Sequence, residues 1–425
     1  MSRSFKLRQP AELPDEVKDA LLRGAVAAIS VSGGKDSAIA AIATHEALEA
    51  LSHTGPRLLI HADLGRIEWK DSIKSCERLS KLLGYPLEVT KRTQGDMIDR
   101  WEQRWHDNLA RYENLEVSRI ISPWSSAQWR FCTSEMKVHP IARRLSEMYP
   151  GQTILNITGI RQEESHKRKD APAWKIHKPL DDKRGCTGIT WNPIRLFTEA
   201  QIYQIHEDND IEKHVAYVKF HSSRVSCAFC ILASLHDLVQ STYCVENLDA
   251  YFLLIDLEFR SSFSFQSNRW LAEIRESLLS KDQRKQFELA RALARQRQMI
   301  EETLPDSAHL KKGVPIVMPT PKEAEKIAKV RADITKLFSL TPRYVTPQAV
   351  RKRYAQLILD KTASQEQDVF ENLLEALPDS ASSDTYAKST WHKSVHQDEN
   401  KLHTSATHSV PFLYRGAPHK LAEAD

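Results

Sequence analysis

The sequence has few cysteines, no long apolar run and almost no net charge. Six cysteines in 425 residues are too sparse for a disulfide scaffold and suit buried, metal-binding or reactive roles. No apolar run approaches the roughly 18 residues that a membrane-spanning helix needs, so we expect no membrane partner. Lys and Arg total 60 against 56 Asp and Glu, a formal charge of +4. A nucleic-acid partner would therefore require clustered positive charge.

What is present is the composition of a soluble globular protein. Hydrophobic residues make up 41%, charged residues 27% and aromatic residues 8%, and the length allows roughly two to three domains. The first residues lack the apolar stretch of a secretory signal, so we expect a cytoplasmic location.

Strand and helix patterns alternate along the first half of the chain. An apolar run at residues 24–31 is followed by two glycines and a helical pattern at residues 38–48. Further strands are predicted at residues 57–62, 87–90 and 153–158, and an amphipathic helix at residues 73–83. This alternation predicts an α/β fold with a doubly wound, mainly parallel sheet. Its ligands should lie beyond the carboxyl ends of the strands, just after Val31, Ala62 and Thr158.

Beyond about residue 215 the strand signal fades and helical periodicity takes over, most clearly over residues 270–300. We therefore expect a mostly helical C-terminal region. The predicted divisions are an N-terminal leader at 1–20, an α/β nucleotide-binding domain at 21–235, a helical region at 236–376 and a polar, weakly ordered tail at 377–425.

The helical stretch carries a local excess of basic residues. They are Arg275, Lys281, Arg284, Lys285, Arg291, Arg295 and Arg297. A solvated helix face explains them, and a surface for a phosphate backbone is the alternative.

The turn at residues 32–37 reads Ser-Gly-Gly-Lys-Asp-Ser and follows the first predicted strand. Its glycines let the backbone approach phosphate oxygens, and the next helix presents unpaired N–H groups. Lys35 adds a positive charge, Ser32 and Ser37 add hydroxyl donors, and Asp36 suits a helix cap or a magnesium partner. If only the glycines are considered, an ordinary strand–turn–helix connection is a better explanation than a phosphate site. The spacing is not the GxxxxGK[ST] of motor-type ATPases.

Polar residues follow the other predicted strands as well. Arg161 can neutralise a phosphate or sulfate because its fork matches two oxygens, and a surface ion pair with Glu163 or Glu164 is the alternative. Asp63 can bind ribose hydroxyls or magnesium, or it can cap the following turn.

Cysteines form a second group of candidates. Cys227 and Cys230 have the two-residue gap that lets both sulfurs reach one metal or each other. With Cys132 they make three thiolates, and Cys186 or Cys244 could supply a fourth, which suits an iron–sulfur cluster better than a redox disulfide. Packing as small buried apolar residues is the alternative.

Basic residues flank one of these cysteines. Arg130 and Lys137 lie on either side of Cys132, where they can stabilise a negative substrate or activate the thiol. Either role places positive charge in one cleft.

Five segments, in this order over residues 25–235, resemble the phosphoadenosine phosphosulfate reductase family of the adenine-nucleotide alpha-hydrolase (PP-loop ATP pyrophosphatase) superfamily. They are the turn itself, residues 61–65, residues 129–140, residues 159–168 and residues 191–217. The resemblance implies that adenine nucleotide, as ATP or phosphoadenosine phosphosulfate, binds with Mg²⁺ at Ser32, Gly33, Gly34, Lys35, Asp36, Ser37, His61, Asp63, Gly159, Arg161, Glu164 and Ser165. It also implies catalytic roles for Lys35, Arg161 and Cys230.

The resemblance extends to the cysteines. Cluster-containing adenylyl-sulfate reductases and the sulfurtransferases of DNA phosphorothioation carry a comparable CxxC, which implies a 4Fe-4S cluster at Cys132, Cys227 and Cys230. The sequence departs from the reductases because Phe131 precedes Cys132 where they have paired cysteines, and because no cysteine follows Cys244. The C-terminal thiol of the reductases is thus absent, and the character is closest to that of the phosphorothioation-type sulfurtransferases.

Three functions follow as hypotheses. The first is ATP cleavage between the α and β phosphates, adenylation of an acceptor and sulfur transfer to it. A nucleic acid would be the acceptor, and a cysteine desulfurase or thioredoxin the sulfur-donor partner. The second is a sulfonucleotide (phosphoadenylyl-sulfate) reductase with Cys230 or Cys244 as its nucleophile. The third is a nucleotide-sensing module of a defence or mobile-element assembly.

Overall fold

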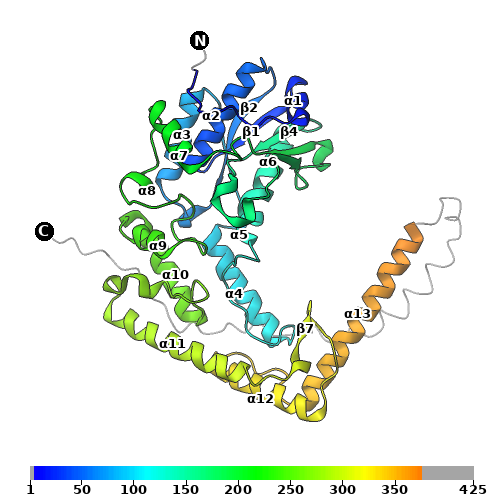
Figure 1. Cartoon of the computed structure of the whole chain (residues 1–425). Helices are drawn as coiled ribbons and strands as arrows, with labels where there is room; N and C mark the ends of the chain where they lie inside the picture. The colour runs from blue at the N-terminus through cyan, green and yellow to red at the C-terminus, as the bar shows by residue number, and fades with distance from the viewer. Residues whose placement is uncertain (1–3, 376–425) are drawn as a thin grey trace. The chain divides into compact units, whose positions relative to one another are not determined.

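The computed structural model describes residues 4–375, with side chains described for all but Lys167 and residues 362–375. Contacts divide the chain into two units, Met1–Leu357 and Ile358–Asp425. Of the elements that the structure describes, the first unit holds the eight strands and all the helices up to α12 (Figure 1). The predicted tail at residues 377–425 lies outside the described residues.

A six-stranded sheet forms the centre of the α/β part, in the order β3-β2-β1-β4-β6-β5. The strands are β1 (Val26–Ser30), β2 (Arg57–Asp63), β3 (Leu87–Lys91), β4 (Thr153–Ile157), β5 (Trp174–Ile176) and β6 (Thr187–Trp191). All neighbours pair in parallel except β5 and β6. The mainly parallel sheet predicted from the sequence is therefore confirmed.

Both faces of the sheet are covered by helices. Successive residues of a strand point to opposite sides, so alternate residues of β1 belong to different hydrophobic clusters. Val26 and Ala28 of β1 belong to the hydrophobic cluster under α6. Ala27 and Ile29 belong to the cluster under α2, α3 and α7 on the other face. The covering helices are α2 (Lys35–Ala50), α3 (Asp71–Leu83), α6 (His139–Met148) and α7 (Glu199–Asp208). This is the doubly wound arrangement that the alternating pattern predicted.

The segment predicted as a leader contributes to this core. Helix α1 (Asp15–Leu22) buries Val17 and Leu21 in the cluster that also holds α2. The start of the chain is thus packed against the sheet domain.

Helices dominate the remainder of the described chain. They are α4 (Met97–Glu113), α5 (Phe131–Thr133), α8 (Val215–Val218), α9 (Leu235–Thr242), α10 (Leu248–Ser261), α11 (Lys281–Glu301), α12 (Pro321–Leu337) and α13 (Pro347–Glu375), with a short hairpin of β7 (Leu310–Lys311) and β8 (Val314–Pro315). The helical C-terminal region is confirmed. None of the described helices is both long and apolar enough to span a bilayer.

The helix predicted over residues 270–300 is wrong in its first third. Residues Ala272–Leu278 form a 3₁₀ turn with a kink at Arg275, and the α-helix begins only at Lys281. Ser280 sets that start, because its side chain accepts a hydrogen bond from the Gln283 N–H in a capping box.

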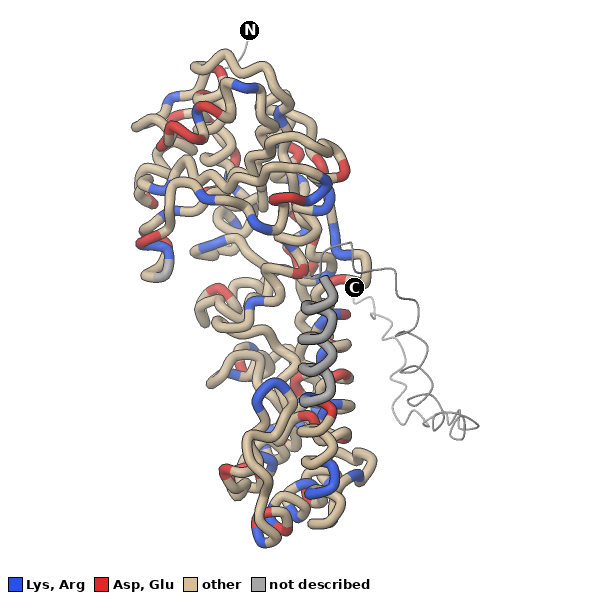
Figure 2. Tube along the Cα trace, turned by 90° about the vertical axis from the view of Figure 1, so that its right-hand side faces the viewer, with Lys and Arg blue, Asp and Glu red and all other residues tan. Residues whose placement is uncertain are grey.

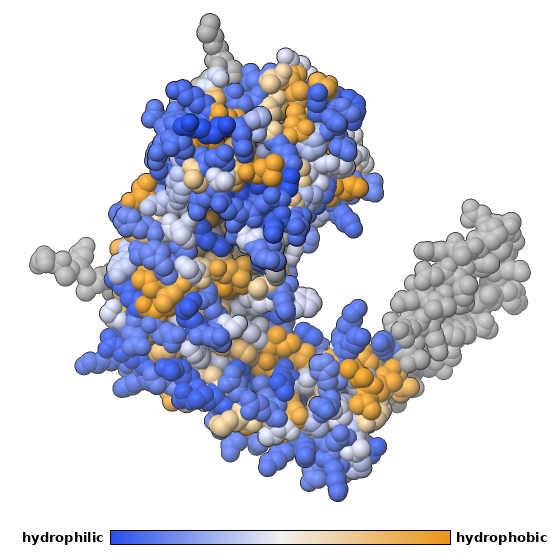
Figure 3. All heavy atoms as spheres, viewed as in Figure 1, coloured by the Kyte–Doolittle hydropathy of each residue, from blue (hydrophilic) through white to orange (hydrophobic). Residues whose placement is uncertain are grey.

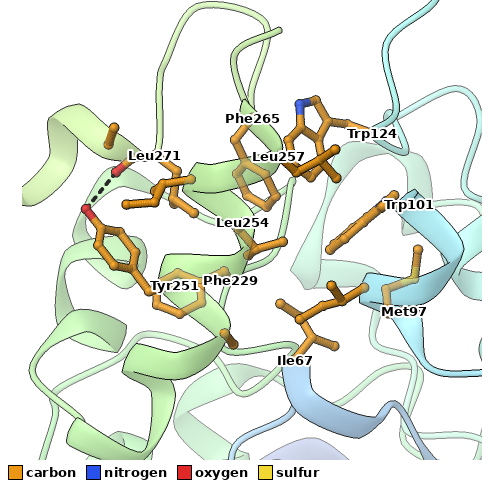
Figure 4. Packing of buried hydrophobic residues seen from close by; sticks show 14 of the residues in the cluster. Ile67, Met97, Trp101, Trp124, Phe229, Tyr251, Leu254, Leu257, Phe265 and Leu271 are labelled. Carbon is orange, nitrogen blue, oxygen red and sulfur yellow. Dashed lines mark hydrogen bonds between the residues drawn. The ribbon is translucent and has the colours of Figure 1, made fainter. Parts of the chain in front are cut away.

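A large aromatic cluster joins α4 to α10 and to the segment between Cys227 and Cys230 (Figure 4). Trp101 packs edge-on against Trp124 and Phe265, with ring centroids 5.4 and 6.0 Å away. Phe229 lies 5.6 Å from Tyr251, whose hydroxyl donates to the Leu271 carbonyl at 3.2 Å. Hydrophobic packing therefore crosses residue 235, where the domain division was predicted.

The basic stretch is only partly a surface. The guanidinium of Arg297 is buried, with its carbon 3.4 Å from the centre of the Phe263 ring. Arg275 stacks on Tyr243 at 4.2 Å and donates to the Thr242 carbonyl. Both residues therefore belong to the packing, and the interpretation of a solvated helix face is wrong for them. The exposed members are Lys281, Arg284, Lys285 and Arg295. Lys and Arg are spread along the tube of this region (Figure 2), and the visible surface is mainly hydrophilic with separate apolar patches (Figure 3).

Candidate active site

A cleft of about 730 Å³ lies at the carboxyl ends of β1, β2 and β4. Its lining includes residues 32 and 34–37, Leu64 and residues 158–161, which matches the place predicted from the strand order. Six basic side chains and five acidic ones also line it. They are Lys35, Arg130, Lys137, Arg161, Arg168 and Arg224, and Asp36, Glu68, Glu163, Glu164 and Glu199.

The turn after β1 is shaped by its glycines. Gly33 has φ +75°, and a Cβ there would lie 3.0 Å from the Ser72 carbonyl oxygen, so a larger residue would be strained. Gly34 precedes α2 with no side-chain cap. Ser37 folds back, and its hydroxyl donates to the Gly34 carbonyl at 2.9 Å and accepts from the Ser32 N–H at 3.2 Å. The first turn of α2 thus faces the cleft without a capping carboxylate.

Lys35 is held inside the cleft by acidic and carbonyl oxygens. Its side chain is 4% exposed, and its Nζ lies 3.1 Å from Glu199 and 3.8 Å from Asp36. It also donates to the Ser223 carbonyl at 3.3 Å. Burial acts to lower the pKa of Lys35, but Tyr217, Asp36, Tyr203 and Glu199 outweigh it and raise that pKa. Lys35 therefore stays charged.

Arg161, in the segment after β4, contacts the carboxylate of Asp36 as well. Its side chain is 3% exposed, and its Nε donates to Asp36 at 2.5 Å. Its Nη1 lies 3.0 Å from Glu163, so the ion pair considered from the sequence does form, between a buried guanidinium and an exposed carboxylate. Asp36 pairs with Arg161 and lies in the first turn of α2, so the helix-cap role considered for Asp36 is wrong. Asp36 instead links the two cations.

Glycine is required where β4 ends. A Cβ on Gly159 would lie 2.8 Å from the Asp36 carbonyl oxygen, closer than side chains tolerate. Next to it, Glu164 accepts from the Arg161 N–H at 3.1 Å and pairs with Arg168. Ser165 also lines the cleft.

His61 and Asp63 stand apart from the cleft lining. The ring of His61 is buried, with Nδ1 2.9 Å from the Val31 carbonyl and Nε2 3.4 Å from Glu68. Burial opposes its charge, but Cys76 and Glu68 raise the pKa of His61 to about 11. Asp63 accepts from the Gly65 N–H at 2.8 Å. It therefore caps the following turn, which was the alternative to binding ribose or magnesium. Nucleotide contacts for both residues stay predictions.

Glu199 and Ser223 are site residues that the sequence did not single out. Thr198 caps α7 through a capping box with Gln201, which places Glu199 at the first helical position and toward Lys35. A capping box after a strand was the available signal. Ser223 contributes only a carbonyl oxygen, which no side-chain pattern reveals.

The CxxC motif is anchored beside the cleft. The Ala228 N–H donates to the Ile67 carbonyl at 2.8 Å, and Phe229 is fully buried. The Cys230 sulfur accepts from the Leu232 N–H at 3.4 Å and from Arg224 at 3.9 Å. Two N–H donors therefore face the Cys230 sulfur.

Cys132 and Lys137 lie close enough to Cys227 to affect its pKa. Burial, and after it the Cys230 thiol, raise the pKa of Cys227 to about 12, with Cys132 adding to the rise and Lys137 opposing it. All six cysteines are free. Within residues 4–375, however, no three His, Cys, Asp or Glu side chains come close enough together to hold a metal ion.

The residues as placed therefore do not form a cluster's ligand set. The 4Fe-4S cluster on Cys132, Cys227 and Cys230 stays a prediction. Of the candidate fourth ligands, Cys186 lies in the core under α6, while Cys244 is buried in the aromatic cluster.

This arrangement defines a class: a parallel α/β domain with a glycine turn and a lysine at the start of the helix after β1. The sequence model of the phosphoadenosine phosphosulfate reductase domain matches residues 26–233. The α/β domain of this chain belongs to that family, within the PP-loop superfamily. No curated protein sequence matches the chain.

Two solved structures are similar at low identity. One is the phosphate complex of phosphoadenylyl-sulfate (PAPS) reductase from Candida auris, at 14% identity over 52% of this chain and 98% of that chain, with a TM-score of 0.31. The other is the U34-tRNA thiolase NcsA from Methanococcus maripaludis with its 4Fe-4S cluster, at 13% identity over 70% of this chain and 78% of that chain, with a TM-score of 0.33.

Proposed function

We propose that this chain is an ATP-using enzyme that cleaves ATP between the α and β phosphates, adenylates an acceptor and lets sulfur displace AMP. The observation that carries the proposal is the pairing of Lys35 and Arg161 across Asp36 at the glycine turn. Two buried cations beside the free end of a helix make a site for a polyanion.

Nucleotide binding would exchange partners within the cleft. Lys35 now pairs with Glu199, which is 53% exposed, so a phosphate can replace that carboxylate with little burial of new charge. The main-chain N–H groups at the start of α2 supply further donors. The resulting site holds the triphosphate without any covalent contact.

Magnesium fits the donor set. Mg²⁺ prefers one or two carboxylates plus phosphate oxygens and water, and Asp36 offers a carboxylate beside the turn. When bound with the nucleotide, the ion would neutralise charge on the phosphates.

The first chemical step is an in-line displacement. An acceptor oxygen attacks the α phosphorus, the bond between that phosphorus and the α–β bridging oxygen breaks, and pyrophosphate leaves with the electron pair. Lys35 and Arg161 would stabilise the charge that develops on the phosphoryl oxygens. Catalysis is then mainly positioning and electrostatics.

Cys230 would carry the sulfur. A persulfide of a donor protein passes its outer sulfur to the Cys230 thiolate and leaves as a thiolate. That sulfur attacks the acceptor atom bearing the adenylated oxygen, and AMP departs with the oxygen. Cys227 then attacks the Cys230 sulfur, which frees the thiolated product and leaves a Cys227–Cys230 disulfide for a dithiol reductant of the thioredoxin type. We place these reactions in the cytoplasm, where ATP and reduced thiols are available.

The same site gives two alternative proposals, a reductase of the family and a nucleotide-binding module of a different class. A sulfonucleotide reductase would release sulfite from the phosphosulfate in a thioredoxin-dependent reaction, with Cys230 or Cys244 as nucleophile. A nucleotide-sensing module of a defence or mobile-element assembly would bind ATP with little turnover.

The deciding experiment is mass spectrometry of the nucleotides formed from ATP and Mg²⁺. AMP and pyrophosphate are expected, and Lys35→Ala should abolish them. ADP as product would contradict the proposal. Sulfite from the phosphosulfate would favour the reductase, and intact bound ATP would favour the sensing module.

A further inference from the structure

We propose that Trp129, Arg130, Lys137 and Arg224 form an acceptor rim that binds a single strand of nucleic acid, with a base stacked on Trp129 and phosphates on the three cations. The inference rests on the proposed function, because it names the acceptor class of the same site. Acceptor binding is measurable without turnover, so the two proposals can fail separately.

The cations of the cleft fall into two sets. Lys35, Arg161 and Arg168 pair with carboxylates of the cleft itself. Arg130, Lys137 and Arg224 also line it, yet none of these three forms an ion pair with any residue in the described range. The rim thus carries positive charge that the protein leaves uncompensated.

The few contacts of these cations leave donors available. Arg130 Nε donates to the Ala127 carbonyl at 3.2 Å, and among the residues that the structure describes Arg224 reaches only the Cys230 sulfur, at 3.9 Å. Their charges also bear on Arg168, since burial and then Arg224 and Arg130 lower the pKa of Arg168. Guanidinium groups that repel one another across a cleft would be relieved by a bound anion. Phosphodiester groups suit them because each phosphate accepts a guanidinium fork.

Trp129 supplies the aromatic part of the rim. Of the tryptophans in residues 4–375, it alone is exposed, at 74%. A tight turn fixes the backbone there, because the Trp129 N–H donates to Ser126 Oγ at 3.0 Å and the Ser126 N–H donates to the Trp129 carbonyl at 3.3 Å. A large aromatic side chain held in water beside uncompensated cations is the pattern of single-strand binding.

The rim also stands next to the thiols. Cys132 follows Arg130 by two residues in the chain, and Arg224 contacts Cys230 directly. A strand held on these residues brings a nucleotide to the sulfur. A single strand fits better than a duplex because an unstacked base can reach both the tryptophan and the thiol.

The test is fluorescence anisotropy of labelled single-stranded DNA and RNA of about 12 nucleotides with the full chain. Trp129→Ala should weaken binding by about 5- to 100-fold, and Trp129→Phe should retain most of it. Arg130→Ala and Arg224→Ala should weaken binding and flatten its dependence on salt, since each removes a phosphate contact.

Matched controls lie outside the cleft. Val245→Ala removes an equally exposed apolar side chain, and Lys281→Ala with Arg284→Ala removes two exposed charges from α11; both should bind as the wild type does. The proposal is overturned if the α11 variant loses binding while the rim variants keep it, or if duplex DNA or poly-glutamate binds as tightly as the single strand. AMP formation by the wild type is scored separately, so a failure of nucleotide cleavage is distinguishable from a failure of the rim.

Discussion

The hydroxyl of Tyr217 accepts a hydrogen bond from the main-chain N–H of Lys35, at 3.3 Å. The same oxygen accepts from the Val225 N–H at 3.1 Å, and the Lys35 ammonium lies 5.2 Å from the centre of the tyrosine ring. One phenol therefore connects the phosphate turn to the segment that leads into the CxxC motif.

Removing that hydroxyl should destabilise the protein. In Tyr217→Phe two N–H groups lose their acceptor, and we expect the free energy of unfolding to fall by about 1–3 kcal/mol. Urea denaturation measures the change. Tyr243→Phe, whose ring is half exposed and stacked on Arg275, is the control and should shift it by less than about 0.5 kcal/mol. Equal behaviour of the two variants would mean that the phenol bridge contributes nothing.

Lys35→Ala should weaken ATP binding. The loss of a charged hydrogen bond to phosphate is worth about 1.5–3 kcal/mol, or roughly 10- to 150-fold in affinity. Isothermal titration calorimetry with ATP and Mg²⁺ checks it, with Lys281→Ala as an exposed lysine control. Unchanged affinity would show that the turn does not bind the phosphates.

Glu199→Gln should have the opposite effect. The carboxylate of Glu199 now competes for Lys35 at 3.1 Å, so its removal frees the ammonium for phosphate. Because the Glu199 carboxylate is 53% exposed and already screened by solvent, the gain should be small, about 1.5- to 5-fold tighter ATP binding. Glu207→Gln, which removes a similar carboxylate from an ion pair with Lys213, is the matched control. Weaker binding by Glu199→Gln would instead make Glu199 a positive determinant of the site.

The stability of the protein should depend on His214 below neutral pH. Burial lowers the pKa of His214 to about 4, from 6.5, although Asp71 opposes the shift. The unfolded chain therefore binds a proton between pH 6.5 and 4 that the folded chain excludes. This stabilising contribution is complete above pH 6.5 and is lost as the pH falls toward 4, by up to about 1.4 kcal/mol per pH unit.

His214→Asn isolates that contribution. His214 Nδ1 accepts from the Ala216 N–H at 3.0 Å, and asparagine can cap the same helix without titrating. Urea denaturation from pH 7 to pH 4.5 should show a shallower decline for the variant than for the wild type. Parallel declines would rule out the histidine as the cause.

Three cysteine variants separate the two versions of the sulfur chemistry. In the persulfide route Cys230 takes up sulfur and Cys227 resolves the product, while Cys132 is not needed. After incubation with a cysteine desulfurase and cysteine, intact-protein mass spectrometry should show added sulfur in the wild type and in Cys132→Ala, and none in Cys230→Ala. Cys227→Ala should keep the added sulfur but fail to turn over. Loss of bound iron and of sulfur uptake in all three variants would instead establish the cluster.

The sheet and its turn could be predicted because their signals are local. Residues 24–37 carry an apolar run, two glycines and the start of a helix within one short segment, and the structure follows them closely. Pairings that join distant segments left no such signal. Asp36 and Arg161 are 125 residues apart, and nothing in either segment names the other as its partner.

Burial in the helical region was the harder property to predict. Arg297 looks like a surface residue beside Arg295, yet it sits on the Phe263 ring. Helix α4 with Trp101 and Trp105 was not predicted, because its apolar face becomes evident only against α10. Apolar residues that recur every 3.6 residues predict a helix. Which face of that helix is buried depends on its packing partners, which the sequence alone does not identify.

Phe229 is fully buried between the two cysteines of the motif, with its ring tilted against that of Tyr251, and this packing limits where the chain can be shortened. The family region ends near residue 233. Truncation there would remove α10 from its contact with the tryptophans and expose apolar surface beside the thiols. The boundary of the family match is thus not the boundary of an independently folding domain. Truncation or insertion near residue 233 should cause aggregation rather than give a smaller enzyme.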